Sequence, residues 1–263
     1  MALERAAIMG AGVMGEAMIV SLMRSGLAGK SIVIREKRPD RVAELTNRHG
    51  VVTGSLSDRD LVIVAVKPQD ISGTLTELAS EISESALIVS LLAGVKSAKF
   101  EEALRPGARV IRVMPNTPLL LGAGASAVAR GKNATSEDVA LVISILEKSG
   151  VAIEVSESLM DAVTATSGSG PAYVFRFVEA MIAAATELGL SEAEATLLVK
   201  ETLIGAAKMI SDSGKAVATL RENVTSPNGT TAAALTSFNE SDIDGIVLRA
   251  MKAARDRSIE LSN

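Results

Sequence analysis

The sequence predicts an α/β fold with a doubly wound, mostly parallel sheet, followed by an all-helical part. Short apolar strands alternate with helical segments through the first 155 residues, and only helical patterns follow. The segment 61–66, LVIVAV, is apolar at every position, as a strand buried on both faces must be. A glycine-rich turn directly after the first strand, described below, agrees with this fold class.

The first part contains seven predicted strands and five predicted helices in alternating order. We predict strands at 6–9, 31–35, 61–66, 86–90, 109–113, 125–129 and 151–155. We predict helices at 13–25, 39–48, 68–82, 96–104 and 135–148. Such an order is typical of parallel strands joined by crossover helices, so we assign residues 1–162 to one domain.

The second domain, 163–263, is predicted to be all-helical. The stretch 167–171, SGSGP, is interpreted as a flexible stop before a helix that ends near residue 188. Ser191 and Glu194 have the spacing of a capping box at the start of the next helix, which runs to about residue 213. Further helices are expected at 215–222, after Thr230, and from residue 241 or 242 to about 261.

Composition excludes several classes of function. With no cysteine, the chain has no disulfide, no thiolate nucleophile and no Cys-ligated zinc, and we expect no metal site. Only 2% of residues are aromatic and the net charge is −4, so nucleic-acid binding is disfavoured. No apolar run is long enough for a membrane span, and the N-terminus does not resemble a signal peptide. We therefore expect a cytoplasmic protein that does not bind membranes.

Several helices of the second domain are apolar around most of their circumference, for example AMIAAATELGL within 180–190. Helices of this kind are normally buried, and about 100 residues have difficulty hiding them within one protomer. We predict that a partner subunit covers them. A well-packed monomeric bundle is the alternative.

The strongest functional motif follows the first strand. Gly10, Gly12 and Gly15 form the pattern G-x-G-x-x-G with Val13 and Met14 between them, and a helix begins here. The first glycine makes a tight turn, the second allows a pyrophosphate to approach the backbone, and the third lets helix and strand pack closely. The helix N-terminus offers free N–H groups to phosphates. The motif therefore predicts a Rossmann-type site for a nicotinamide dinucleotide.

Residues after the second strand decide which dinucleotide is bound. An acidic residue there accepts a ribose hydroxyl of NAD, whereas basic residues receive the 2′-phosphate of NADP. This chain has both, in the run Arg35, Glu36, Lys37 and Arg38. Because three cations surround one acid, we predict NADPH, with NADH as the alternative.

Two further positions are expected at the carboxyl edge of the sheet, where ligands bind. Lys67, followed by Pro68, comes after a buried strand, and Asn116 follows another. Either side chain could face the nicotinamide ribose, or it could only shape its loop.

Packing does not explain the segment 224–231, VTSPNGTT, which leads into a helix. It places hydroxyls and free backbone N–H groups at a helix N-terminus, which is a suitable receptor for a carboxylate. The alternative is an ordinary capped turn, with Ser226 or Thr230 as the N-cap.

Together, five motifs resemble those of pyrroline-5-carboxylate reductases, in order and over nearly the whole chain. They are GAGVMG at 10–15, AVKP at 65–68, VMPNTP at 113–118, DAVTATSGSGPAY at 161–173 and NVTSPNGTTAAAL at 223–235. The resemblance implies hydride transfer from NAD(P)H to the C=N bond of 1-pyrroline-5-carboxylate, which gives L-proline. It also implies helical domains that interlock into dimers, with decamers of five dimers in many bacterial members.

The resemblance further implies roles for individual residues. Gly229, Thr230 and Thr231, with Ser226 nearby, would bind the substrate, and Thr231 would hydrogen-bond the ring nitrogen. Positions implied to contact the cofactor are Gly10, Gly12, Val13, Met14, Ala65, Val66, Lys67, Pro68 and Asn223. One position departs from many relatives, which have Gly-Gly where this chain has Asn228-Gly229. Asn tolerates left-handed backbone, so the loop is expected to survive the change, and its detailed shape and the substrate affinity stay open.

No strong acid or base is evident among these residues. The single histidine, His49, lies far from the motifs in sequence and is expected at the surface, and Tyr173 is expected to be a buried helix residue. A β-hydroxyacid dehydrogenase is one alternative, but its catalytic lysine is missing because no Lys occurs between Lys148 and Lys200. A dinucleotide-binding sensor without turnover is another.

Overall fold

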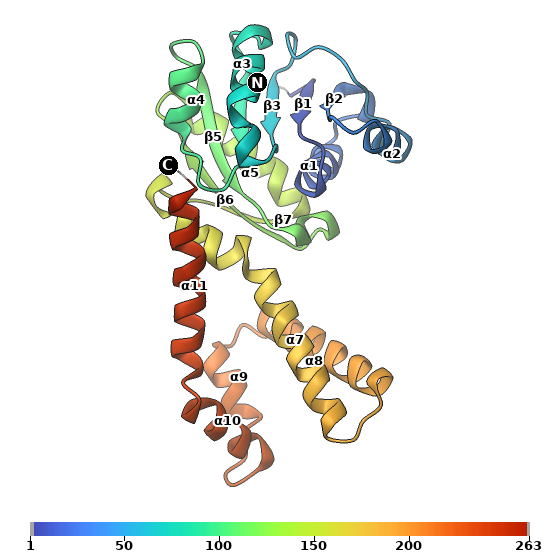
Figure 1. The fold of residues 1–263 in the computed structure, drawn as a ribbon, viewed down its shortest axis with the longest axis vertical. Helices are drawn as coiled ribbons and strands as arrows, with labels where there is room; N and C mark the ends of the chain where they lie inside the picture. The colour runs from blue at the N-terminus through green and yellow to red at the C-terminus, as the bar shows by residue number, and fades with distance from the viewer. Residues whose placement is uncertain (1–2, 262–263) are drawn as a thin grey trace. The chain divides into compact units, whose positions relative to one another are not determined.

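The computed structural model describes residues 3–261 and contains a seven-stranded sheet in the order β2-β1-β3-β4-β5-β6-β7 (Figure 1). All neighbouring strands are parallel except β5 and β6, which pair antiparallel. The strands are β1 (Ala6–Met9), β2 (Ile32–Arg35), β3 (Leu61–Val64), β4 (Leu87–Ser90), β5 (Arg109–Met114), β6 (Gly124–Arg130) and β7 (Gly150–Glu154). The predicted doubly wound, mostly parallel sheet is confirmed.

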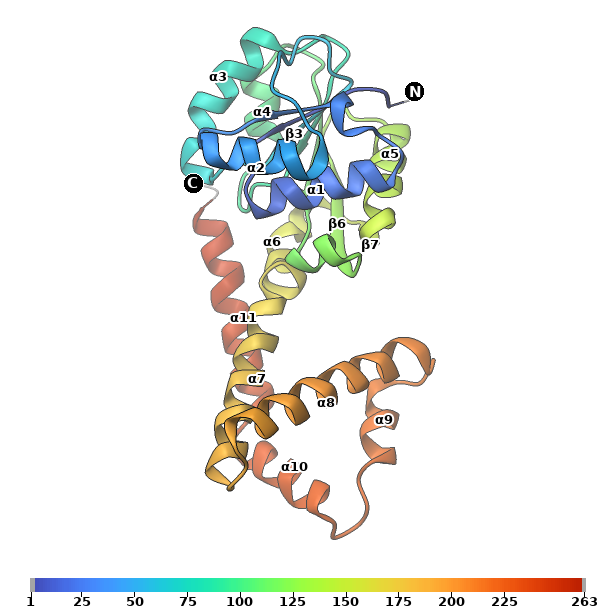
Figure 2. The ribbon, with the colours of Figure 1, turned by 90° about the vertical axis from the view of Figure 1, so that its right-hand side faces the viewer.

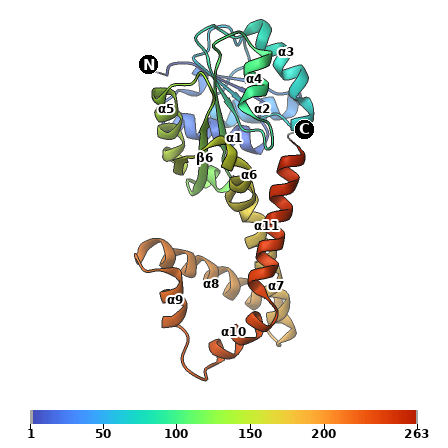
Figure 3. The same cartoon turned by 90° about the vertical axis from the view of Figure 1, so that its left-hand side faces the viewer.

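Helices cover both faces of this sheet (Figure 3). One face packs against α1 (Val13–Arg24), α2 (Pro39–His49) and α5 (Ser136–Leu146), and the other against α3 (Ile71–Glu81) and α4 (Ser97–Ala103). Ile8 and Met9 show the division, since the first belongs to the α1 core and the second to the α3 core. Strands buried on both faces need apolar side chains at every position, as the sequence shows.

By compactness the chain divides into two units. The sheet unit comprises Met1–Pro171 and Ala253–Asn263, and the helical unit comprises Ala172–Lys252. The sheet unit thus includes the short helices after β7 and the last turns of α11 (Ile243–Glu260), where Ser258 donates a hydrogen bond to Asp161 at 2.7 Å. The division of function between residues 1–162 and 163–263 stays a prediction.

The segment expected to be a flexible stop is helical instead, so that prediction is wrong. After α6 (Met160–Val163), residues Thr164–Gly168 form a π-helical turn, and α7 begins at Gly170. The Ser169 N–H donates to the Thr164 carbonyl at 2.8 Å, which continues the helical hydrogen bonding through the glycines. The side chain of Asn116 supports the same turn by donating to the Ser167 carbonyl at 3.2 Å.

The helical unit has few buried apolar side chains of its own. Its helices are α7 (Gly170–Glu187), α8 (Glu192–Asp212), α9 (Val217–Asn223), α10 (Thr230–Glu240) and the first part of α11. Figure 2 shows α8, α9 and α10 spread apart. Only Ala195, Val199 and Leu220 are buried apolar residues among 172–252. The predicted capping box is confirmed, because Ser191 Oγ accepts from the Glu194 N–H and Glu194 accepts from the Ser191 N–H.

Many large apolar side chains of this unit are exposed. They include Phe175, Leu188, Leu197, Leu198, Ile204, Met209, Ile210 and Leu248. Exposed apolar side chains in such number are typical of an interaction site in soluble proteins. Within residues 3–261, no helix has the length and apolar character needed to cross a membrane.

A buried ionic cluster joins α1 to α2. Glu16, whose side chain is 10% exposed, is hydrogen-bonded to Arg41, lies 2.7 Å from Arg48 Nη1 and 2.9 Å from His49 Nε2. Burial alone would raise the pKa of Glu16, but hydrogen bonds from His49, Arg41 and Arg48 outweigh it and lower the pKa to about 2. Arg41 also donates from Nε to the Ala11 carbonyl at 3.0 Å, so the cluster supports the glycine turn.

The lowered pKa of Glu16 predicts a stability change in acid. Because the ordinary value is 4.5 and the folded value about 2, the carboxylate stabilises the fold above about pH 5, and this contribution disappears as the pH falls towards 2. Glu16→Gln should lower the free energy of unfolding at pH 7 by about 3 kcal/mol, and by progressively less between pH 5 and pH 2. Urea denaturation at several pH values would measure this.

The matched control is Glu84→Gln, because Glu84 is exposed and makes no hydrogen bond or ion pair within residues 3–261. Its denaturation midpoint should follow that of the unsubstituted chain. A Glu16→Gln deficit that stays constant from pH 7 to pH 3 would contradict the assignment.

Candidate functional site

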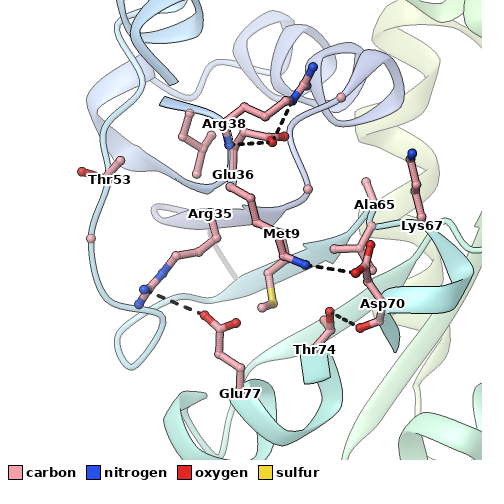
Figure 4. Close-up of a pocket in the computed structure, with 16 residues that line it drawn as sticks. Met9, Arg35, Glu36, Arg38, Thr53, Ala65, Lys67, Asp70, Thr74 and Glu77 are labelled. Atoms are coloured by element: carbon pink, nitrogen blue, oxygen red, sulfur yellow. Dashed lines mark hydrogen bonds and ion pairs between the residues drawn. The ribbon is translucent and has the colours of Figure 1, made fainter. Parts of the chain in front are cut away.

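A pocket of about 760 Å³ lies in the sheet unit at the carboxyl ends of β1, β2 and β3 (Figure 4). Since β2 and β3 flank β1, the chain leaves β1 and β3 towards opposite faces of the sheet. Such a switch point opens a crevice where parallel α/β sheets bind ligands. Predicted residues that line it are Gly10, Gly12, Arg35, Lys37, Arg38, Ala65, Val66 and Lys67.

The glycine turn fits closely against β3. Gly10 has φ +86°, and a Cβ atom there would lie 2.7 Å from the Ala65 carbonyl oxygen. A Cβ atom on Gly15 would collide with the Gly10 carbonyl oxygen. By contrast, a Cβ atom on Gly12 would meet no protein atom within 4 Å, because this glycine faces the pocket.

The start of α1 faces the same turn. Gly12 is the N-cap, and no side chain caps the helix, so its first N–H groups remain available to a ligand. Val13, the first helical residue, is 56% exposed, although it carries an apolar side chain. An open helix N-terminus beside a glycine without close neighbours suits a pyrophosphate. The residues present therefore fit a dinucleotide.

The three cations after β2 each have a carboxylate partner. Arg35 donates to Glu81 at 2.8 Å and its Nη1 lies 3.8 Å from Glu77. The Nζ of Lys37 lies 3.0 Å from Asp70 Oδ1. Arg38 Nε donates to Glu36 at 3.1 Å, as Figure 4 shows. Each of these cations therefore lines the pocket with a carboxylate beside it.

Lys67 differs from the other cations of the pocket. It is exposed, directly precedes Pro68, and has no ion-pair partner within residues 3–261. A lysine ammonium at the carboxyl edge of β3 can hold an anionic or hydroxyl group of a ligand by charge and hydrogen bonding. The structure thus leaves its predicted cofactor role available.

Asn116 does not line the pocket. It is 8% exposed, its Nδ2 donates to the Ser167 carbonyl at 3.2 Å, and its Oδ1 accepts from the Ala125 N–H at 2.9 Å. The amide therefore fixes the loop after β5 against the π-helical turn and the start of β6, which favours the loop-shaping alternative raised above. A cofactor contact of Asn116 stays a prediction.

Several lining residues were not predicted from the sequence. They are Met9, Ile34, Thr53, Gly54, Asp70, Thr74 and Glu77, whereas Glu36, which also lines the pocket, was identified from the sequence as the acid after the second strand. Met9 is the last residue of β1 and Ile34 the last but one of β2, so the strand pattern could have identified them. Thr53 and Gly54 lie in the loop after α2, and the last three lie on or before α3, where no local motif marks them.

In the helical unit, the predicted substrate segment forms the start of α10. Gly229 is the N-cap, and no side chain caps the helix, so the alternative with Ser226 or Thr230 as N-cap is not what the structure shows. Asn228 has φ 61°, the left-handed conformation expected for it. No hydrogen bond within residues 3–261 involves the hydroxyls of Thr230 or Thr231. Asn223, the last residue of α9, is exposed.

Two predictions about single residues need correction. His49 is not a free surface residue, because its side chain is 13% exposed and bound to Glu16 in the cluster between α1 and α2. Tyr173 on α7 is half-buried as a residue, while its hydroxyl oxygen is buried without a hydrogen-bond partner in the described chain. The sequence could not reveal the first contact, which joins residues 33 positions apart.

Comparison with known proteins decides the family. The chain is 39% identical over 263 residues to the pyrroline-5-carboxylate reductase of Corynebacterium melassecola, and the match covers 97% of each chain. The chain belongs to the pyrroline-5-carboxylate reductase family. A pyrroline-5-carboxylate reductase structure from Coxiella burnetii has the same fold, with a TM-score of 0.91, 33% identity and complete coverage of both chains. The family resemblance found in the sequence is thereby confirmed.

Further matches fall separately on the α/β part and on the helical part of the chain. The family model for pyrroline-5-carboxylate reductase dimerisation matches residues 157–261, and a model of F420-dependent NADP oxidoreductases matches residues 5–94. A pyrroline carboxylate reductase of Plasmodium falciparum, solved with NADP bound, has a TM-score of 0.85 at 29% identity and covers 99% of this chain. The fold class predicted from the sequence is confirmed for both parts.

Substitution of Gly12 and of Gly15 in the glycine turn should have opposite effects on ligand binding and stability. Gly12→Ala adds a methyl group in open space beside the pocket, so the melting temperature should stay within about 2 °C while dinucleotide affinity falls about tenfold or more. Gly15→Ala forces a backbone collision and should destabilise the fold by about 1–3 kcal/mol. Calorimetry of unfolding and nucleotide titration would separate the effects, and unaltered affinity in Gly12→Ala would contradict a pyrophosphate at this position.

Proposed function

We propose that this chain is a pyrroline-5-carboxylate reductase that transfers hydride from a nicotinamide dinucleotide to the C=N bond of 1-pyrroline-5-carboxylate, forming L-proline. Relatives of this name match the chain from end to end. The observation that carries the proposal is that one chain contains both a pocket at a glycine turn, in the sheet unit, and an uncapped helix start, in the helical unit.

The start of α10 is the proposed substrate site. The backbone N–H groups of Thr230 and Thr231 precede the hydrogen-bonded part of the helix and can bind the carboxylate of the imino acid, beside the N-cap Gly229. The hydroxyl of Thr231, which is half-buried and unpartnered in the described chain, would orient the ring nitrogen. Ser226 accepts the Gly229 N–H through its carbonyl at 3.0 Å and so holds the loop beside the site.

The reaction requires little proton transfer by the protein. The protonated imine is an iminium, which accepts hydride at C2, the imine carbon, and the electron pair of the C=N π bond moves to the nitrogen. Bound dinucleotide supplies the hydride, and the nitrogen keeps its proton, so the product is a secondary amine. The residues of this chain contribute orientation, which can lower a barrier by about 7 kcal/mol or more.

We also propose that the chain self-associates through its helical unit. The exposed apolar surface of that unit and the match of residues 157–261 to a dimerisation family support a dimer. A decamer and a cytoplasmic location stay predictions from the sequence, as does activity on NADPH rather than NADH.

The enzymatic proposal is tested by nucleotide oxidation with pyrroline-5-carboxylate, with 3-hydroxyisobutyrate and NAD(P)⁺ as the assay for the β-hydroxyacid dehydrogenase alternative. Thr231→Ala should lower kcat/KM for the imino acid about 10- to 100-fold by removing one hydrogen bond to a charged group, with dinucleotide affinity unchanged. Thr231→Ser should restore most of the rate.

Thr236→Ala is the control on the same helix, because its hydroxyl donates to the Ala232 carbonyl at 3.0 Å and takes no part in the proposed site. Equal kinetics for Thr231→Ala and Thr236→Ala would remove Thr231 from the mechanism. Absence of turnover with either dinucleotide would overturn the proposed function.

The self-association proposal predicts the effect of charge on α8. Leu198 and Met209 are about half exposed and lie three turns apart on one helix face, so Leu198→Glu/Met209→Glu should convert dimers to monomers. Light scattering after size-exclusion chromatography measures the mass. Leu121→Glu, an 85% exposed position in the sheet unit, should leave the dimer intact, and a double variant that remains dimeric would refute this interface.

A further inference from the structure

Glu36 occupies a fixed position at the end of β2. It directly follows the strand, its side chain is 10% exposed, and it lines the pocket between the glycine turn and α2. Its Oε2 accepts the Ala11 N–H at 3.1 Å, and its Oε1 accepts the N–H and Nε of Arg38, each at 3.1 Å. The carboxylate therefore cannot leave the pocket without breaking its hydrogen bonds to Ala11 in the glycine turn and to Arg38 before α2.

The same contacts keep this carboxylate ionised and leave part of it available. Burial would raise the pKa of Glu36, but the hydrogen bonds from Arg38 and Ala11 outweigh this effect and lower it. A carboxylate has about four lone-pair sites, and the contacts above use three. A free site remains on Oε2, the oxygen nearer the glycine turn, for a hydroxyl donor.

The surroundings of Glu36 do not favour a phosphate. The three cations that follow β2 face four carboxylates, those of Glu36, Asp70, Glu77 and Glu81. Arg38, the cation closest to Glu36, is already its ion-pair partner. A ribose 2′-phosphate would bring nearly two negative charges towards a buried carboxylate and would have to take Arg38 from it.

We propose that Glu36 accepts the adenosine ribose hydroxyls and makes this chain bind NADH in preference to NADPH. The inference rests on the dinucleotide-dependent function proposed above. It departs from the NADPH preference predicted from the sequence, because that prediction counted the cations without their partners. A buried acid at this position repels the 2′-phosphate of NADPH and also accepts hydrogen bonds from the ribose hydroxyls of NADH.

The experiment measures dissociation constants of NADH and NADPH for the full-length protein by fluorescence titration, without imino acid. In the unsubstituted protein NADH should bind about tenfold or more tightly than NADPH. Glu36→Gln should reduce the ratio of the two constants at least about tenfold, by weakening NADH and strengthening NADPH. Thermal unfolding confirms that each variant is folded.

Glu77→Gln is the matched control, since it removes the same charge from the same pocket at a more exposed position. It should change both affinities together and leave their ratio within about threefold. Tighter binding of NADPH than of NADH by the unsubstituted protein would overturn the inference, and this measurement does not depend on the folding of any variant. An equal change in the ratio of the two dissociation constants in Glu36→Gln and Glu77→Gln would also overturn it.

Failure of the inference on Glu36 can be distinguished from failure of the proposed function. Turnover of pyrroline-5-carboxylate that is best with NADPH would retain the reductase and remove the role of Glu36. NADH-selective binding without turnover would retain the role of Glu36 and remove the reductase.

Discussion

The close approach of the turn after β1 to the end of β3 determines how the rest of the site is built. Only glycine fits at positions 10 and 15, because a side chain would meet the backbone of Ala65 in the first case and of Gly10 in the second. Within this turn the backbone of Ala11 is held on both sides, by Glu36 at its N–H and by Arg41 at its carbonyl. One residue thus joins the ends of β1 and β2 to α2 at the edge where a dinucleotide fits.

Local patterns predicted much of this edge. Strand positions followed from uninterrupted apolar runs, and the glycine spacing located the turn to the residue, because both depend on backbone constraints that act over a few residues. Predicted strand and helix ends were less accurate. The run 61–66 ends as a strand at Val64, and the helix expected from residue 68 begins as a 3₁₀ turn over Pro68–Asp70.

The electrostatics of the site could not be predicted from the same patterns. The charges of Arg35 and Lys37 were evident in the sequence, but their partners Glu81 and Asp70 lie 46 and 33 residues further along. These pairs form because the chain crosses from β3 to α3, and spacing alone does not indicate which acids reach which cations. The number of cations after a strand therefore says less about a phosphate than the number left unpaired.

The helical unit shows the same contrast. Three residues of spacing were enough to predict the capping box of α8, and the left-handed tolerance of Asn explained how Asn228 replaces glycine before α10. Periodicity also showed which helices are apolar, but not which surfaces cover them, since that depends on contacts between chains. With three buried apolar residues, the unit lacks the core that would hold α8 to α10 in place.

These observations bear on catalysis under the proposed function. His49 is committed to Glu16, and α7 contains no lysine, so the described chain offers neither of these groups as an acid or base for the imine. Rate acceleration must then come mainly from holding the ring against the nicotinamide, which is effective only when the anchor is rigid. Because the anchor lies at the start of α10, and α10 belongs to a unit with little core of its own, assembly with a second chain would be a condition for the geometry of catalysis and not only for stability.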